Sequence, residues 1–79
     1  MNVDIVRKIL TDVLETNKVE NVDIDYDLTS LGLDSLNYMK LIVLLEDHCN
    51  ISIPIEKINF SNFISISAIC KLIKEINNK

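Results

Sequence analysis

The chain has 79 residues and a net charge of −4; 48% of its residues are apolar, but only 5% are aromatic and Trp is absent. A chain of this length forms one domain with a small aliphatic core, which leaves little stability for a deep internal active site. Twelve acidic residues against eight basic ones argue against nucleic acid as a partner, because phosphate backbones are bound by basic surfaces.

The chain contains only one Gly and one Pro, so few tight turns are expected. This composition favours long helices over a β-sandwich, so residues 1–79 are expected to form a single all-α domain. The sequence contains neither a signal peptide nor a run of about 20 apolar residues. We therefore expect a cytoplasmic protein that binds no membrane.

The first predicted helix covers residues 3–16, with Asn2 as its N-cap. Its buried stripe follows helical spacing through Val6, Ile9, Leu10, Val13 and Leu14. A long acidic connection, residues 17–34, follows, and connections of this length are often functional. Four apolar side chains are expected to pin it onto the helices: Ile24, Leu28, Leu31 and Leu33.

The second predicted helix begins at Asp34 or Ser35, ends near residue 49 and has two apolar sides. One stripe consists of Tyr38, Leu41, Ile42, Leu45 and Cys49. Almost opposite lie Leu36, Met39 and Val43, interleaved with Lys40 and Asp47. Either this helix is unusually buried, or the second stripe is an exposed protein-docking surface, and we favour docking because one small bundle can hardly bury both sides.

Two further helices complete the predicted fold. A short one is expected near residues 55–60, after Pro54, and a longer one over residues 65–77, with Ser65 as its cap. Its buried stripe comprises Ile66, Ile69, Cys70, Ile73 and Ile76. The prediction is a small four-helix bundle with a long first loop and a short third helix.

Metal chemistry is not indicated by the sequence. Cys49, Cys70 and the single His48 match no zinc-site spacing, and both cysteines are expected to be buried and reduced. An EF-hand-like spacing of Asp23, Asp25, Asp27, Thr29 and Asp34 has Leu28 where a calcium loop requires Gly. We therefore predict no metal site.

Ser35 lies at the expected first turn of the second helix, where the helix dipole favours a phosphodiester on its oxygen. The alternative is that Ser35 only caps the helix. It is a poor nucleophile, because His48 lies about 20 Å along the same helix and no Gly-rich oxyanion loop exists. We therefore do not expect an enzyme.

The segment Gly32-Leu33-Asp34-Ser35-Leu36 resembles the attachment motif of the acyl and peptidyl carrier protein family. Further resemblance lies in residues 41–47, 51–54 and 62–66, so that it covers nearly the whole chain in order. The resemblance implies 4′-phosphopantetheine on Ser35, between Asp34 and Leu36, added by a phosphopantetheinyl transferase. The arm would hold acyl or aminoacyl cargo as a thioester for a loading enzyme and downstream synthase enzymes.

The resemblance also makes the second helix the main docking surface, with docking residues Leu36, Met39, Lys40, Val43, Glu46 and Asp47. Fatty-acid carriers usually have acidic residues where this chain has Asn37 and Lys40, and Tyr38 is bulkier than usual. These departures favour specialised biosynthesis of the polyketide or nonribosomal-peptide type. The alternatives are a housekeeping fatty-acid carrier, a D-alanyl carrier or, in a different class, an unmodified helical protein-interaction domain. We expect a monomer.

Overall fold

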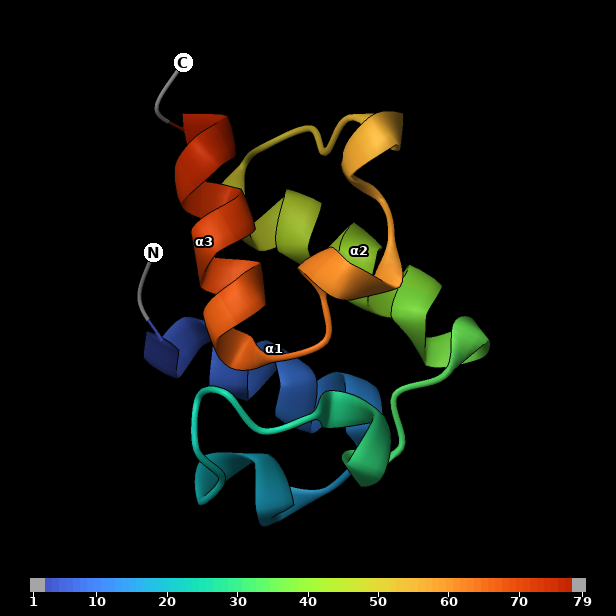
Figure 1. Cartoon of the computed structure of the whole chain (residues 1–79), viewed down its shortest axis with the longest axis vertical. Coiled ribbons are helices and arrows are strands. Elements are labelled where there is room, and N and C mark those ends of the chain that lie inside the picture. The colour runs from blue at the N-terminus through green and yellow to red at the C-terminus, as the bar shows by residue number, and fades with distance from the viewer. Residues whose placement is uncertain (1–2, 78–79) are drawn as a thin grey trace.

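The structure, a computed structural model, describes residues 3–77 and is all-helical over that range (Figure 1). Its three α-helices are α1 (Val3–Leu14), α2 (Ser35–Cys49) and α3 (Ile66–Asn77). The predicted N-cap Asn2 lies outside the described residues. No helix within residues 3–77 is long and apolar enough to cross a membrane.

The predicted four-helix bundle is wrong in its third helix. The segment after Pro54 forms two 3₁₀ turns, Ile55–Lys57 and Phe60–Asn62, in place of one short α-helix. The first turn ends at Ile58, whose backbone (φ −85°, ψ 88°) is not helical. The second starts afresh because the Asn59 side chain accepts a hydrogen bond from the Asn62 amide at 3.1 Å. Two competing local turns therefore replace one continuous helix.

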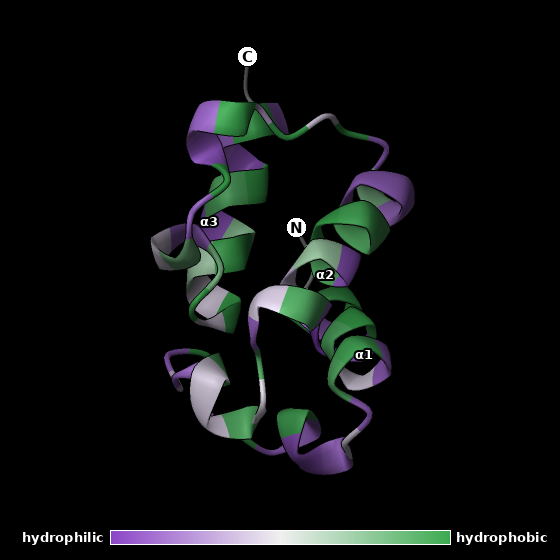
Figure 2. Cartoon of the chain, turned by 90° about the vertical axis from the view of Figure 1, so that its right-hand side faces the viewer, coloured by the Kyte–Doolittle hydropathy of each residue, from purple (hydrophilic) through white to green (hydrophobic). Residues whose placement is uncertain are grey.

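The core is aliphatic and is organised around α1, which packs against both α2 and α3. In Figure 2 the hydrophobic side of α3 is turned towards α1 and α2. The predicted stripe of α1 is buried at Val6, Ile9, Leu10 and Val13, and that of α3 at Ile66, Ile69 and Ile73, with Leu72 added. These stripes confirm the helical spacing on which they were predicted.

The end of α1 comes two residues earlier than predicted. Glu15 adopts a left-handed backbone conformation (φ 53°), which stops the helix at Leu14. The Thr16 hydroxyl then accepts a hydrogen bond from the Lys18 amide and opens a 3₁₀ turn, Asn17–Glu20. Val19, in this turn, is fully buried.

The long connection between α1 and α2 is more ordered than a plain loop, because it contains a second 3₁₀ turn, Leu28–Leu31. Of its predicted anchors, Leu28 and Leu33 are buried and Leu31 is half-buried. Ile24 is wrong as an anchor, since its side chain is exposed. Its backbone carbonyl instead accepts a hydrogen bond from the Ser67 amide at 2.9 Å, which ties the connection to the start of α3.

Arg7, a residue of α1, also holds this connection. One terminal nitrogen of Arg7 donates hydrogen bonds to the carbonyls of Val19 and Val22, at 2.7 and 2.8 Å. The guanidinium group thus satisfies backbone carbonyls of an irregular segment that would otherwise lack partners. The start of α3 follows the prediction closely, because the Ser65 hydroxyl accepts a hydrogen bond from the Ala68 amide at 3.1 Å.

Candidate functional site

The candidate site is built at the N-terminus of α2, where Ser35 is the first helical residue and is exposed. The N-cap is Asp34, whose carboxylate accepts hydrogen bonds from the Leu36 and Asn37 amides, both at 3.0 Å. Asp34 therefore caps the helix. Within the described part of the chain, the Ser35 hydroxyl forms no hydrogen bond. A phosphodiester on Ser35 would feel the helix dipole, but those two amides are already satisfied.

Asn37 fixes the turn that leads to Ser35. Its side-chain oxygen accepts a hydrogen bond from the Asp34 amide at 2.7 Å, which completes a capping box with Asp34. Its side-chain nitrogen donates to the Gly32 carbonyl at 2.9 Å. Gly32 has a left-handed backbone (φ 108°), a conformation that glycine adopts without steric cost.

The other side of this turn is anchored in the core. The Leu33 side chain is buried, and its amide donates a hydrogen bond to the Leu28 carbonyl at 3.1 Å. From the sequence, Asn37 stood out only as a departure from an acidic position, and its hydrogen bonds within this turn were not predicted. A polar residue three positions after an Asp cap was the available signal, because that spacing is typical of a capping box.

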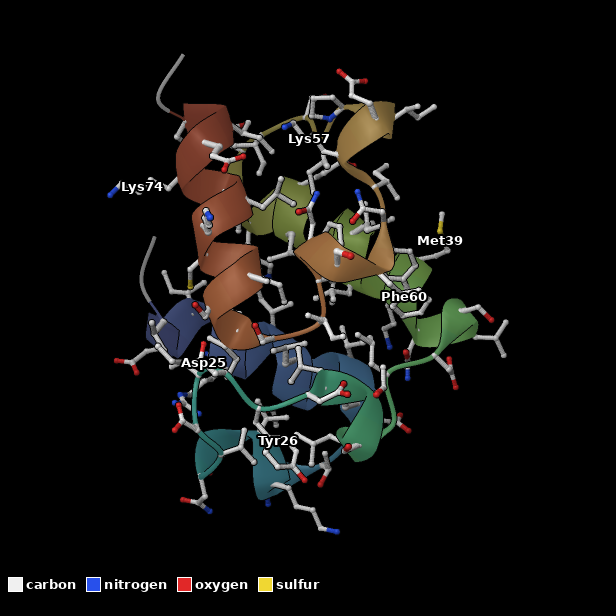
Figure 3. All side chains as sticks on the ribbon, viewed as in Figure 1. Asp25, Tyr26, Met39, Lys57, Phe60 and Lys74 are labelled. Atoms are coloured by element: carbon white, nitrogen blue, oxygen red, sulfur yellow. The ribbon has the colours of Figure 1, made fainter. Side chains whose placement is uncertain are left out.

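The second apolar stripe of α2 is exposed, as predicted. The exposed fractions are 85% for Leu36, 57% for Met39 and 60% for Val43. We call these three side chains the outer face of α2, and Figure 3 shows Met39 pointing away from the helix into solvent. The opposite stripe is buried at Tyr38, Leu41, Ile42 and Leu45, with Cys49 half-buried. The interpretation of α2 as a helix buried on both sides is therefore wrong.

The charged residues predicted for docking have different surroundings. Lys40 and Asp47 are exposed. Glu46 is half-buried, and its carboxylate accepts a hydrogen bond from the Ile53 amide at 2.8 Å. The structure therefore gives Glu46 a part in holding the chain that leaves α2, which the sequence did not reveal.

Aromatic rings tie the segment between α2 and α3 to the buried side of α2. The Tyr38 ring stacks on that of Phe60, with centroids 4.8 Å apart, and meets the Phe63 ring edge-on at 5.3 Å. Burial raises the pKa of Tyr38, and its hydroxyl has no hydrogen-bond partner among residues 3–77. Phe60 is 43% exposed, and it lies on the same side of the molecule as Met39 in Figure 3.

Other reactive groups do not converge on Ser35. His48 lies in the last turn of α2, at the opposite end of the helix. In the range that the structure covers, no group of three or more His, Cys, Asp or Glu side chains could hold a metal ion. Cys49 and Cys70 are half-buried thiols, and burial is the main cause that raises the pKa of each. The arrangement can present a hydroxyl to another protein, but the adjacent Asp34 carboxylate is engaged as the helix cap and no histidine within residues 3–77 lies beside the hydroxyl.

Comparison with known proteins identifies the family to which the chain belongs. No curated protein matches the chain. Residues 4–73 match the family described as the phosphopantetheine attachment site, and Ser35 with its turn lies inside the matched range. Domains of this family carry 4′-phosphopantetheine covalently and are in general carriers and not catalysts. Because the match covers most of the 79 residues, the chain belongs to the phosphopantetheine attachment-site family.

Proposed function

We propose that this chain carries 4′-phosphopantetheine on Ser35 and presents acyl or aminoacyl groups to partner enzymes. The observation that supports the proposal is the exposed Ser35 hydroxyl, which is left out of the helix cap by Asp34 and stands on a turn fixed by Asn37. The residues present also fit the group, because an exposed oxygen at a helix N-terminus tolerates a phosphodiester.

In the attachment step, the Ser35 oxygen attacks the phosphorus of coenzyme A to which pantetheine is attached. A serine O–P bond forms, the pyrophosphate P–O bond breaks, and adenosine 3′,5′-bisphosphate leaves with the bonding electrons. The serine proton passes to a base of the transferase or to water, because among residues 3–77 the adjacent Asp34 carboxylate is engaged by the Leu36 and Asn37 amides and His48 lies at the far end of α2. Once attached, the group supplies a terminal thiol that holds cargo as a thioester.

Partner enzymes would dock on the outer face of α2, which begins one residue after Ser35. Exposed apolar side chains rimmed by charge are typical of protein-interaction sites, and Met39 adapts to differently shaped partners. Lys40 places a positive charge among them, where a fatty-acid carrier usually has an acidic residue. For this reason we favour specialised biosynthesis over housekeeping fatty-acid synthesis, and Lys40 would face an acidic group of the partner.

The test is intact mass after incubation with coenzyme A, magnesium and a broad-specificity phosphopantetheinyl transferase. The wild-type chain should gain one phosphopantetheine, and Ser35→Ala should gain none. Ser30→Ala is the matched control, since Ser30 is exposed in the preceding 3₁₀ turn and its loss should leave the reaction unchanged. A wild-type chain that stays unmodified would favour the rival function, a helical protein-interaction domain.

The cargo class can be tested on the modified chain. A malonyl transferase, an amino-acid adenylating enzyme, an acyl ligase and a D-alanine ligase would each be offered the same sample. Efficient charging by malonyl transferase followed by fatty-acid synthase enzymes would contradict the specialised pathway. Charging with D-alanine would place the chain with the cell-wall carriers.

A further inference from the structure

The side chain of Asn37 bridges two backbone groups of the attachment turn, the Asp34 amide and the Gly32 carbonyl. Through its oxygen it holds the Asp34 amide at 2.7 Å, and through its nitrogen it holds the Gly32 carbonyl at 2.9 Å. Its own backbone amide is held by the Asp34 carboxylate at 3.0 Å. Asn37 is half-buried beneath this turn and does not belong to the exposed outer face of α2.

These contacts restrict the backbone on both sides of Ser35. On the N-terminal side the buried Leu33 side chain fixes the chain in the core, and on the C-terminal side the Tyr38 amide donates to the Asp34 carbonyl at 2.9 Å. Gly32, the residue just before Leu33, is left-handed and has the greatest backbone freedom in this turn. The Asn37 side-chain amide restricts the backbone of Gly32, because it donates a hydrogen bond to the Gly32 carbonyl.

We infer that Asn37 is a positioning residue for the attachment reaction: it holds the 32–35 turn so that the Ser35 oxygen reaches the transferred phosphorus in a fixed orientation. The inference rests on the proposed attachment at Ser35. Orientation of the reacting atom contributes to the rate of a bound complex and not to its formation. The effect of Asn37 therefore belongs in kcat of the transferase, with this chain as the varied substrate.

Asn37→Asp isolates the contact to Gly32. A carboxylate still accepts a hydrogen bond from the Asp34 amide and suits the first turn of a helix, but it cannot donate to the Gly32 carbonyl. We expect kcat to fall about three- to tenfold, the range that follows from the net free energy of one hydrogen bond. KM for the chain should change less than twofold, and the melting temperature should not fall.

Asn62→Asp is the matched control. The Asn62 side-chain nitrogen donates to the Lys57 carbonyl at 2.8 Å, across the same five-residue separation, but in the segment that follows α2. This variant loses an equivalent hydrogen bond and should leave kcat unchanged. Amide hydrogen exchange of residues 33–35 should accelerate in Asn37→Asp and stay unchanged in Asn62→Asp.

Asn37→Ser is the second variant: it replaces the amide by a single shorter hydroxyl, which cannot bridge the Asp34 amide and the Gly32 carbonyl as the amide does, and it adds no charge. It should lose kcat to a similar extent, and it keeps the test informative if Asn37→Asp fails to fold. A rise in KM at constant kcat would overturn the inference, since it would assign Asn37 to docking. Unchanged kinetics in both variants, or a loss confined to Asn37→Asp, would also overturn it. If the wild-type chain itself is not modified, the proposed function fails first.

Discussion

At the residue scale, Asp27 shows how exposed polar side chains shape the connection that leads to the site. Its carboxylate accepts hydrogen bonds from the Thr29 hydroxyl at 2.6 Å and from the Thr29 amide at 2.9 Å. These bonds, the hydroxyl first, lower the pKa of Asp27 below the ordinary value of 3.8. The carboxylate thereby caps the turn that buries Leu28. At least one acidic residue of this connection, Asp27, therefore stabilises its local structure.

Thr29→Val should raise the pKa of Asp27 towards 3.8, while leaving it somewhat depressed because the backbone amide still donates. A lowered pKa in the folded state adds stability above the ordinary pKa, and this contribution is lost as the pH falls through the lowered value. In the wild-type chain this stability should therefore be lost only at a pH below the ordinary Asp pKa of 3.8. Thr29→Val should make the contribution of Asp27 to stability smaller. Carboxyl-carbon NMR titration of Asp27 measures the shift.

Thr11→Val serves as the control for this titration, because the Thr11 hydroxyl donates to the Arg7 carbonyl at 2.9 Å within α1. It should leave the pKa of Asp27 unchanged. An identical Asp27 titration in wild type and Thr29→Val would contradict the assignment of the hydroxyl as the main cause.

At the element scale, the two sides of α2 have different roles: one packs in the core and the other is exposed. Tyr38 and Leu45 face the core, whereas Met39 and Val43 face solvent. The helix also starts with Asp34 as its cap, so the residue offered for modification is free of a capping contact. A single helix therefore positions the attachment residue and the proposed docking face together, without a deep cavity.

Met39→Glu should raise KM of the transferase for the chain about tenfold or more, in the range of an interface hot spot. The reason is that a carboxylate would be desolvated on the outer face when a partner docks. The melting temperature should change little, because Met39 is 57% exposed. Kinetics of modification and thermal melting by circular dichroism are the measurements.

Ile5→Glu is the matched control for that substitution, since Ile5 is another exposed apolar side chain but lies on α1. Its KM should equal that of wild type. If Met39→Glu unfolds the domain, or if both variants raise KM equally, docking on the outer face is contradicted.

Periodicity predicted these elements well where one helix side faces the core. It predicted the buried stripes of all three α-helices. Because α2 has too many apolar residues for one buried side, it also predicted the exposed second side of that helix. It failed over residues 55–60, where the Asn59 side chain decides between one helix and two turns. It could not find the contact of Asn37 with Gly32 or the contacts of Arg7 and Glu46, because each depends on a carbonyl or amide that only the folded chain brings within reach.

At the scale of the whole molecule, stability depends on a core of small extent. Leu45 is fully buried. Leu45→Ala should lower the free energy of unfolding by about 2–5 kcal/mol, through lost burial and the cavity left behind. This is a large share of the roughly 5–15 kcal/mol that holds a domain folded. Urea denaturation followed by circular dichroism measures the loss.

Leu36→Ala is the control for the core, because the same substitution there removes a side chain that is 85% exposed. Its effect should stay within about 0.5 kcal/mol. Comparable losses for the two leucines would mean that the outer face of α2 is packed against something in the isolated chain.

The stack of Tyr38 on Phe60 gives the protein its own optical probe. The chain contains no Trp and two Tyr, and the other one, Tyr26, is 42% exposed. A tyrosine ring packed against two phenylalanine rings, one stacked and one edge-on, should dominate the near-ultraviolet circular dichroism, a signal that is lost when tertiary packing loosens. Loosening of the segment between α2 and α3 can thus be followed in unlabelled protein.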